Sequence, residues 1–268
     1  MEKTIHYCWF GGKPLPESAK KCIRSWERFF PDYRIQRWDE ASFDVSSCAY
    51  AKEAYDHSKW AFVSDYARFW ILYQFGGIYF DTDVEVIRSM DDILSTGPFM
   101  GCQRSINDDG TGGFDVATGL GMAAEKGMPL FGRILEKYEG MHFEKPDGTL
   151  NYDSVVRIVT GVLKMQGFKG TGMVEIVEGV RIYPPEFFCP MDYLTGEMKI
   201  TENTRSIHHF DGSWVNPAWI KVIEIKRKYA AAGKGGCLRE KLTLLPWRIK
   251  NCVEKEGLKG LLWTKRRG

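Results

Sequence analysis

The sequence predicts an α/β fold with a mostly parallel central sheet, of the kind that binds nucleotides. A strand within residues 3–12, a helix within 15–30 and a second strand within 33–39 follow one another at the start of the chain, as such folds begin. A second helix, within residues 58–77, then leads straight into an apolar strand, Ile78–Phe80. This alternation of strands and helices favours parallel strand pairing.

The first strand ends in a glycine turn and the helix after it is amphipathic. Gly11 and Gly12 close the strand, and Trp9 lies near its carboxyl end. The helix stops before Pro31. Its apolar residues recur at helical spacing, which predicts one continuous helix; they are Ala19, Cys22, Ile23, Trp26, Phe29 and Phe30.

The second helix is apolar on nearly every face, so we expect it to be buried against the sheet. Ser58 is its predicted N-cap, and the pair Gly76-Gly77 is its predicted stop. Two charged side chains interrupt it, Asp65 and Arg68, which are three residues apart and share a face. Such side chains are rarely buried without a partner or a function, so they form either a structural ion pair or part of a site.

The later elements are shorter. Gly119–Ala124 (GLGMAA) matches the dinucleotide-binding fingerprint, but no strong strand precedes it and Pro129 cuts the following helix short. We therefore reject this match, because the strand–turn–helix context is missing. We expect an amphipathic helix within 153–168, a strand and loop within 180–190, and a last strand entering a loop within 205–214.

Two carboxylates, Asp81 and Asp83, follow the apolar strand. Alternate side chains on extended backbone point the same way, so these like charges repel unless a cation or a shared proton lies between them. Paired oxygen ligands suit Mg²⁺ or Mn²⁺. An EF-hand loop counted from Asp81 is excluded, because Val86 and Asp92 stand where it needs Gly and Glu. A phosphatase of the D-x-D-x-T/V type would have Thr or Val in place of Glu85, and a solvated strand end is the remaining alternative.

Size and composition describe an ordinary globular domain, alone or with an appendage. The chain has 268 residues, of which 44% are hydrophobic and 27% are charged. Its apolar stretches are too short to span a bilayer. The seven cysteines show no C-x-x-C pairing, no N-x-S/T sequon is present, and the first residues lack the pattern of a signal peptide. We therefore expect a reducing, cytoplasmic environment.

Charge is distributed unevenly. Residues 221–268 contain fourteen Lys or Arg and four Glu, a net charge of +10, which leaves −8 for residues 1–220 because the whole chain carries +2. Asn216 and Pro217 open a helix into this basic segment. We predict two parts, a body (1–220) and a basic, amphipathic, helical tail (221–268). The tail either meets an anionic partner or is a solvated helical surface.

Three segments, in the same order, resemble family 32 glycosyltransferases. They are IHYCWFGG at 5–12, FVSDYARFWILYQFGGIYFDTDVEV at 62–86 and IHHFDGSW at 207–214. This group is related to yeast initiating mannosyltransferase and many bacterial polysaccharide enzymes, and more distantly to the clostridial glucosylating toxins. The resemblance spans about Lys3 to Trp214 and leaves out the tail. It implies a GT-A fold and a metal-dependent, retaining transferase with a UDP-sugar donor and Mn²⁺ or Mg²⁺ as cofactor.

The resemblance also implies roles for residues of the first two segments. Trp9 matches the aromatic residue that stacks on the donor's uracil, the alternative being a core tryptophan. Asp65 and Arg68 match the helix pair that reaches the sugar hydroxyls and the phosphates. Tyr79 matches a residue beside the diphosphate. Asp81 matches the first D-x-D carboxylate, which touches the ribose and a metal-bound water.

Asp83 matches the second carboxylate, which binds the metal directly. In the third segment the His-x-x-Gly spacing aligns His209 with a further metal ligand, although the neighbouring His208 is an alternative. Trp214 matches the tryptophan that contacts the β-phosphate, and Ser213 is assigned to the same donor site. Both histidines could equally be structural surface residues.

On this reading the catalytic residues are Asp65, Arg68, Asp81 and Asp83. A divalent cation and Arg68 would stabilise the charge that develops on the leaving diphosphate. No carboxylate can be assigned as a nucleophile of the kind that retaining hydrolases use, so front-side attack is the expected route.

The expected partners are a UDP-sugar, a glycan or lipid-linked acceptor of surface polysaccharide or glycolipid assembly, and no nucleic acid. The tail is expected to contact an anionic membrane at the inner face of the plasma membrane, or else to pack on the acidic body. Two other functions stay open at this point: an aspartate-nucleophile phosphatase, and a nucleotide-sugar-binding module without turnover.

Overall fold

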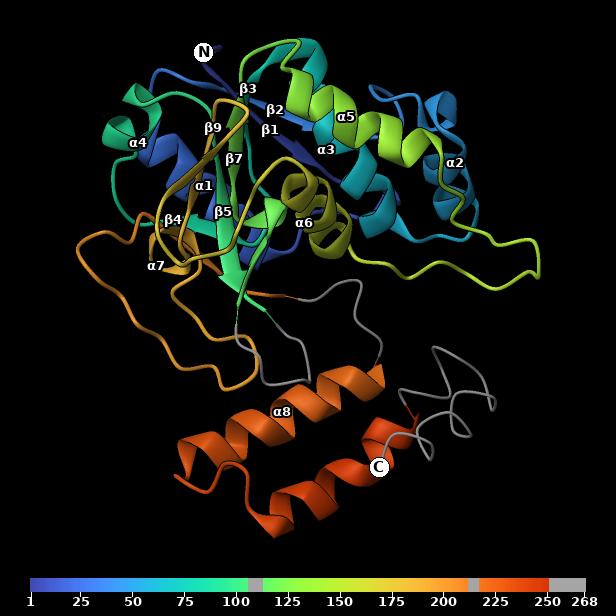
Figure 1. Ribbon diagram of the computed structural model, residues 1–268, viewed down its shortest axis with the longest axis vertical. Helices are drawn as coiled ribbons and strands as arrows, with labels where there is room; N and C mark the ends of the chain where they lie inside the picture. Colours follow the sequence, from blue (N-terminus) through green and yellow to red (C-terminus); the bar gives the residue numbers. More distant parts are fainter. Residues whose placement is uncertain (106–112, 212–216, 251–268) are drawn as a thin grey trace. The chain divides into compact units, whose positions relative to one another are not determined.

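The computed structural model of the chain describes residues 1–105, 113–211 and 217–250, in which strands and helices alternate (Figure 1). The strands are β1 (Thr4–Cys8), β2 (Arg34–Trp38), β3 (Gly77–Tyr79), β4 (Val84–Val86), β5 (Phe99–Arg104), β6 (Phe114–Val116), β7 (Met122–Ala124), β8 (Glu175–Val177), β9 (Val180–Tyr183) and β10 (Ser206–His208). The α-helices are α1 (Glu17–Phe29), α2 (Ala49–Asp56), α3 (Trp60–Phe75), α4 (Asp91–Ser95), α5 (Pro129–Glu139), α6 (Val155–Met165), α7 (Pro185–Phe188) and α8 (Pro217–Ala231), and two 3₁₀ turns are η1 (Val45–Ser47) and η2 (Thr118–Leu120).

The chain divides into two compact units. The first consists of Met1–Pro190 and Lys199–His209, and it contains all ten strands named above. The second consists of Met191–Met198 and Phe210–Gly268, and it contains α8. The predicted domain boundary at residue 220 stays a prediction.

The central sheet of the first unit has eight strands. Their order is β2-β1-β3-β7-β5-β9-β8, and β6 pairs with β5. β1 runs parallel to β2 and β3, and β5 runs parallel to β9, whereas β6, β7 and β8 pair antiparallel with their neighbours. Five of the eight strands thus point the same way. The predicted α/β class with a mostly parallel sheet is confirmed, and β4 and β10 form a separate antiparallel ribbon.

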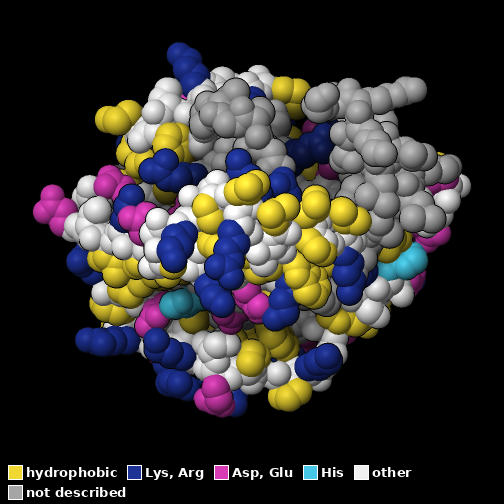
Figure 2. All heavy atoms as spheres, turned by 90° about the horizontal axis from the view of Figure 1, so that it is seen from below, with side chains coloured by type: hydrophobic (Ala, Val, Ile, Leu, Met, Phe, Trp, Pro, Cys, Tyr) yellow, Lys and Arg dark blue, Asp and Glu magenta, His cyan; other side chains and the backbone are white. Residues whose placement is uncertain are grey.

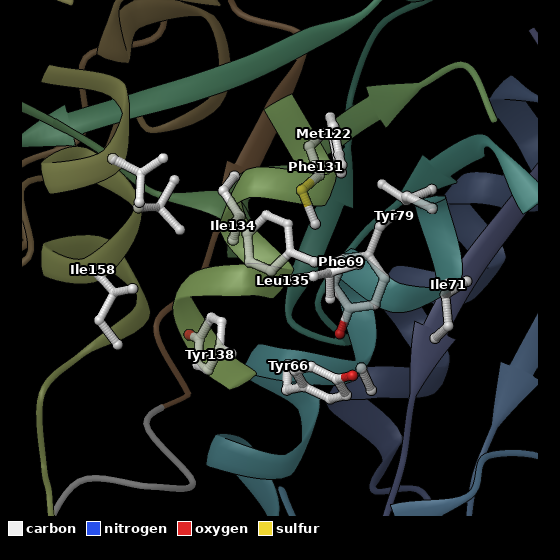
Figure 3. Close-up of a cluster of buried hydrophobic side chains, with 14 of the residues drawn as sticks. Tyr66, Phe69, Ile71, Tyr79, Met122, Phe131, Ile134, Leu135, Tyr138 and Ile158 are labelled. Carbon is white, nitrogen blue, oxygen red and sulfur yellow. The ribbon is translucent and has the colours of Figure 1, made fainter. Parts of the chain in front are cut away.

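Helices α1 and α3 cover opposite faces of this sheet (Figure 1). Tyr7 of β1 and Phe80 face α1, where their rings lie 5.8 and 5.5 Å from that of Trp26. Tyr79 precedes Phe80 on extended backbone, so its side chain points to the other face. There it belongs to the main hydrophobic core, in which Figure 3 shows it beside Phe69 of α3. The sheet is therefore packed on both sides, and β3 emerges from a rigid core.

The predicted opening strand–helix–strand is confirmed as β1, α1 and β2, and the predicted buried helix is α3. Its stop at Gly76 is also confirmed, since Gly76 has a φ of 70°, which glycine adopts most easily. The predicted N-cap is wrong. Ser58 has a φ of 56° and its amide donates to the carbonyl of Tyr55, so it ends α2 instead of starting α3. Lys59 takes the N-cap position.

The second unit contains α8 and, after a short turn, helical residues 238–250. Pro217 opens α8, as predicted. Within the described ranges, no helix is both long and apolar enough to cross a membrane. The helix at 238–250 exposes four large apolar side chains at spacings of four, three and four residues, which places them on one face; they are Leu238, Leu242, Leu245 and Ile249.

Candidate metal and donor site

The two aspartates lie directly after β3, in the turn that leads into β4. Asp83 faces the small ribbon, where its Oδ1 is 3.2 Å from Nε2 of His208 on β10. Asp81, Asp83 and His208 each offer one ligand atom, and these three atoms all lie within 4.8 Å of one another. All three side chains are half-buried. Two carboxylates and one imidazole in this arrangement fit a divalent cation.

The ribbon brings these residues together although they are far apart in the sequence. β4 and β10 pair antiparallel with Val84 opposite His208. Beyond this pair, the amide of His209 donates to the carbonyl of Asp83 over 2.9 Å. The start of β4 and the end of β10 therefore lie side by side, and each contributes a side chain to the cluster.

His209, the ligand chosen from the His-x-x-Gly spacing, does not join this cluster. Its Nε2 lies 2.8 Å from Oε2 of Glu85, and Nζ of Lys21 lies 3.1 Å from Oε1 of the same carboxylate. Burial opposes ionisation of Glu85, but the hydrogen bonds from His209 and Lys21 keep its pKa below the usual value. The geometry thus replaces His209 by His208 as the candidate ligand. The His-x-x-Gly spacing cannot decide between the two histidines. Neighbouring side chains of a strand point to opposite sides, so the ligand depends on which side of β10 faces the aspartates.

Arg68 connects the D-x-D turn to helix α3. Its Nη2 lies 2.9 Å from Oδ1 of Asp65 and 3.3 Å from Oδ1 of Asp81. Its Nε donates to the carbonyl of Ser64, which fixes the direction of the guanidinium. The pKa of Arg68 is raised even though burial opposes its charge, because Asp81, Tyr79 and Asp65 surround it. Arg68 therefore forms ion pairs with both Asp65 and Asp81. This agrees with the prediction that Asp65 and Arg68 are part of a site.

Asp65 is the most strongly desolvated carboxyl group of this network. Burial raises its pKa from 3.8 to about 7, a shift that Arg68 opposes and Asp81 reinforces. Burial thus favours the protonated form of this carboxyl group, whereas Arg68 favours the ionised form. Any ligand that donates a hydrogen bond to this carboxyl would favour the ionised form.

Tyr79 lies beneath the network. Its hydroxyl donates to Oδ1 of Asp81 over 3.1 Å, and the guanidinium of Arg68 lies over its ring at 5.0 Å. The side chain is fully buried, and burial raises the pKa of its hydroxyl well above the usual value. Tyr79 therefore supports Asp81 and Arg68 from the core side of the site.

Trp9 follows β1 as Asp81 follows β3. β1 and β3 are parallel, with His6 opposite Tyr79, so both residues lie at the same edge of the sheet. Trp9 is only partly buried, and its Nε1 donates to the carbonyl of Lys13 over 2.6 Å. A core position is therefore wrong for Trp9, whereas its role as a stacking platform stays a prediction. The other two predicted donor residues, Ser213 and Trp214, lie outside the described residues.

Two residues near the cluster, Glu85 and Gly119, were not predicted as site residues, and His208 was predicted only as the alternative to His209. The amide of Asp81 donates to the carbonyl of Gly119 over 3.2 Å, so the rejected GLGMAA segment lies against the D-x-D turn. The glycines of this segment allow its backbone to approach the D-x-D turn closely, and they do not mark a dinucleotide site.

A comparison with protein-family models identifies the region that contains these residues. Residues 16–100 match the model described as "Glycosyltransferase sugar-binding region containing DXD motif". The match runs from α1 into β5 and includes Asp65, Arg68, Asp81 and Asp83. Residues 16–100 therefore belong to the DXD-containing sugar-binding region of glycosyltransferases. The predicted resemblance is confirmed for this region, and the phosphatase alternative is set aside.

The structure is similar to two solved structures of glycosyltransferases at low sequence identity. The glycosyltransferase PaToxG is 17% identical, with a TM-score of 0.45, over 62% of this chain and 70% of that chain. The galactosyltransferase LgtC, in a complex with donor and acceptor sugar analogues, is 16% identical, with a TM-score of 0.43, over 85% and 95% of the two chains. Both TM-scores are below 0.5, so we base no argument on either likeness. The search of curated proteins found no significant match.

Proposed function

We propose that this chain is a glycosyltransferase that moves a sugar from a UDP-sugar to a glycan or lipid-linked acceptor, with retention at the anomeric carbon and with a divalent cation as cofactor. One observation carries the proposal. Asp81, Asp83 and His208 converge within 4.8 Å, next to a buried arginine at the end of a sheet strand. This arrangement can hold a cation and the phosphates of a nucleotide sugar together.

The three ligand side chains favour Mn²⁺ as the cation. Asp81, Asp83 and His208 would hold it, and the remaining positions would be left for phosphate oxygens and water. Mg²⁺ is usually bound by carboxylate, phosphate and water oxygens, whereas Mn²⁺, a transition metal that also suits carboxylates, accepts one imidazole among them more readily. When bound, the cation would offset the negative charge that grows on the leaving diphosphate.

The chain's own residues would orient the donor and stabilise its charge. Arg68 is held by Asp65 and by the carbonyl of Ser64, so its guanidinium needs no reorganisation when the diphosphate gains charge. Trp9, whose indole is hydrogen-bonded to Lys13, would stack on the uracil from the end of β1. These two contacts would hold the ends of the nucleotide at one edge of the sheet.

Front-side attack by the acceptor is the mechanism we favour for retention. A double-displacement route needs a carboxylate that is free to attack the anomeric carbon. The carboxylates of the site are already engaged: Asp65 with Arg68, Asp81 with Arg68 and Tyr79, and Asp83 with His208. The acceptor hydroxyl would then be deprotonated by an oxygen of the departing phosphate.

A binding module without turnover would show a damaged site. Here both D-x-D carboxylates, Arg68 and an imidazole ligand are present and assembled, which supports an active enzyme. The experiment is a panel of nucleotide sugars in which release of the nucleoside diphosphate is followed with Mn²⁺, with Mg²⁺ and with chelator. Metal-dependent release of UDP supports the proposal. Release from another nucleotide sugar, or equal release in chelator, contradicts it.

For the tail we propose peripheral contact with an anionic membrane on the cytoplasmic side. The helix at 238–250 exposes its apolar face, with Leu238 73% and Leu242 61% exposed. The same helix carries the exposed basic residues Arg239, Lys241, Arg248 and Lys250. Figure 2 shows a face on which Lys and Arg side chains lie among hydrophobic ones. This combination suits a helix that lies in a lipid interface.

A further inference from the structure

Two consecutive histidines at the end of β10 contact two different carboxylates of the neighbouring chain segment. Nε2 of His208 faces Asp83, and Nε2 of His209 faces Glu85 over 2.8 Å. Asp83 and Glu85 alternate along the segment that becomes β4. A second pair of a histidine and a carboxylate, His209 and Glu85, therefore lies directly beside the candidate ligands His208 and Asp83.

The second pair connects the two strands at the point where the cluster forms. His209 makes two bonds to this segment, one from its amide to the carbonyl of Asp83 and one from its ring to Glu85. The next residue, Phe210, has a φ of 54°, an uncommon value for a side chain of this size. The ladder between β4 and β10 thus ends at His209, and the pair with Glu85 closes that end.

Helix α1 holds β4 along its other edge. The indole of Trp26 donates to the carbonyl of Val84 over 2.8 Å, and the hydroxyl of Ser25 accepts from the amide of Val86 over 2.9 Å. Lys21, one turn before Ser25, reaches Glu85 itself. Side chains of α1 therefore take the place of a third strand. β4 is fixed on this side, and its residue Glu85 contacts both Lys21 of α1 and His209.

We propose that Glu85 and His209 are a positioning pair that holds His208 against Asp83 and so sets the affinity of the site for its divalent cation. The inference rests on the proposed function and deepens it. Without the pair, His209 would be attached beside Asp83 only through its backbone amide. The imidazole of His208 would then spend less time within reach of the two aspartates. Outer partners of metal ligands commonly change metal affinity by about 10- to 100-fold.

An ordinary surface ion pair would behave differently. Such pairs contribute little to stability, and their loss leaves distant sites unchanged. His57 and Glu144 form a pair of this kind, with Nε2 2.9 Å from Oε2, far along the chain from the cluster residues. The variant His57→Ala is therefore a matched control for His209→Ala.

The test is Mn²⁺ binding to the full-length chain, followed through the electron paramagnetic resonance signal of free Mn²⁺ in the presence of UDP. We expect Glu85→Ala and His209→Ala each to raise the Kd for Mn²⁺ about tenfold. The double variant should be no worse than either single one, because both changes remove the same interaction. Glu85→Gln keeps an acceptor for the ring N–H of His209, so this variant should bind Mn²⁺ with nearly the Kd of the wild type. His57→Ala should bind like the wild type, and thermal melting should show that all variants fold.

Other outcomes separate the possible failures. Wild-type affinity in both alanine variants would overturn the positioning role while leaving the proposed function intact. Abolished binding in His209→Ala, with unchanged binding in Glu85→Ala, would show that His209 is itself the ligand and would also overturn the inference. A wild-type chain that binds no Mn²⁺ would overturn the proposed metal use and, with it, this inference.

Discussion

Gly119 lies so close to Asp81 that a methyl group added to its Cα would be 2.2 Å from Oδ2 of the aspartate. The backbone of the turn before β7 therefore forms one wall of the D-x-D site. Gly121, two residues on, is placed in the same way against the ring of Phe80, with 2.7 Å to the nearest ring carbon. The first carboxylate of the motif can take its observed position only because a glycine faces it.

Substituting this glycine should damage the site without unfolding the protein. In Gly119→Ala the new methyl group must push away the end of the Asp81 side chain, which is partly exposed and can move outward. We expect the Kd for Mn²⁺-UDP, measured by calorimetry, to rise at least about tenfold, since a displaced ligand weakens metal binding. Gly161→Ala is the control, because nothing lies within 4 Å of its added methyl group. Equal Kd values for Mn²⁺-UDP in Gly119→Ala and Gly161→Ala would show that the close approach of Gly119 to Asp81 does not affect binding.

Removing the second carboxylate should abolish turnover. Asp83→Asn leaves the shape of the side chain but removes a charged ligand and the partner of His208. The lost charge stabilisation is worth several kcal/mol, so kcat should fall by about a thousandfold or more. The measurement is UDP release at saturating Mn²⁺. Asp56→Asn, in an exposed pair with Lys52, serves as the control and should keep full activity.

Two tryptophans should respond in opposite ways to truncation. Trp9→Ala should weaken UDP binding by about 1–3 kcal/mol while the melting temperature hardly changes, because Trp9 is only partly buried. Trp26→Ala empties a fully buried site and should cost roughly 3–5 kcal/mol of stability. Calorimetry with Mn²⁺-UDP and melting curves distinguish the two. Unchanged UDP affinity in Trp9→Ala would exclude the stacking role.

The buried carboxyl of Asp65 should make stability depend on pH. Its pKa is about 7 in the folded chain and 3.8 when solvated. A raised carboxyl pKa stabilises the fold fully below about pH 4, and this contribution is lost as pH rises towards about 7. Urea unfolding between pH 5 and 8, in chelator, should therefore show a downward trend that Asp65→Asn reduces. An identical trend in both proteins would exclude Asp65 as its source.

The exposed face of the C-terminal helix should govern attachment to lipid. Replacing Leu242 and Leu245 by Gln removes apolar side chains that are 61% and 53% exposed. Burying one such side chain is worth about 1.5–3 kcal/mol, so partition to anionic vesicles should fall by at least about tenfold. Met165→Gln, at another exposed apolar position, is the control. Co-sedimentation that is equal for all three proteins, or insensitive to salt, would contradict membrane contact through this helix.

The sequence was sufficient for the elements whose residues follow a regular period. β1, α1, β2 and α3 were predicted because their apolar residues recur at strand or helix spacing, and Gly76 marked the end of α3. The start of α3 was predicted wrongly, since Ser58 satisfies the end of the preceding helix instead. Local chemistry at Ser58 is compatible with both roles, and only the packing of α2 decides between them.

The site was predictable in part. The D-x-D turn and the pair Asp65–Arg68 follow from charge placed within apolar segments, which is uncommon without a purpose. The choice between His208 and His209 depends on which strand β10 pairs with and in which register, and this pairing joins distant parts of the chain. Gly119 was unpredictable for the same reason, because β7 brings it to Asp81 through its pairing with β3.

The most direct test of the central claim is the position of Mn²⁺ in crystals grown with MnCl₂ and UDP, located by anomalous scattering at the manganese edge. We predict one strong peak among Asp81, Asp83 and Nε2 of His208, with the diphosphate of UDP beside it and Arg68 in contact with the phosphates. A peak between Glu85 and His209, or UDP bound with no manganese at the D-x-D turn, would contradict the proposed site.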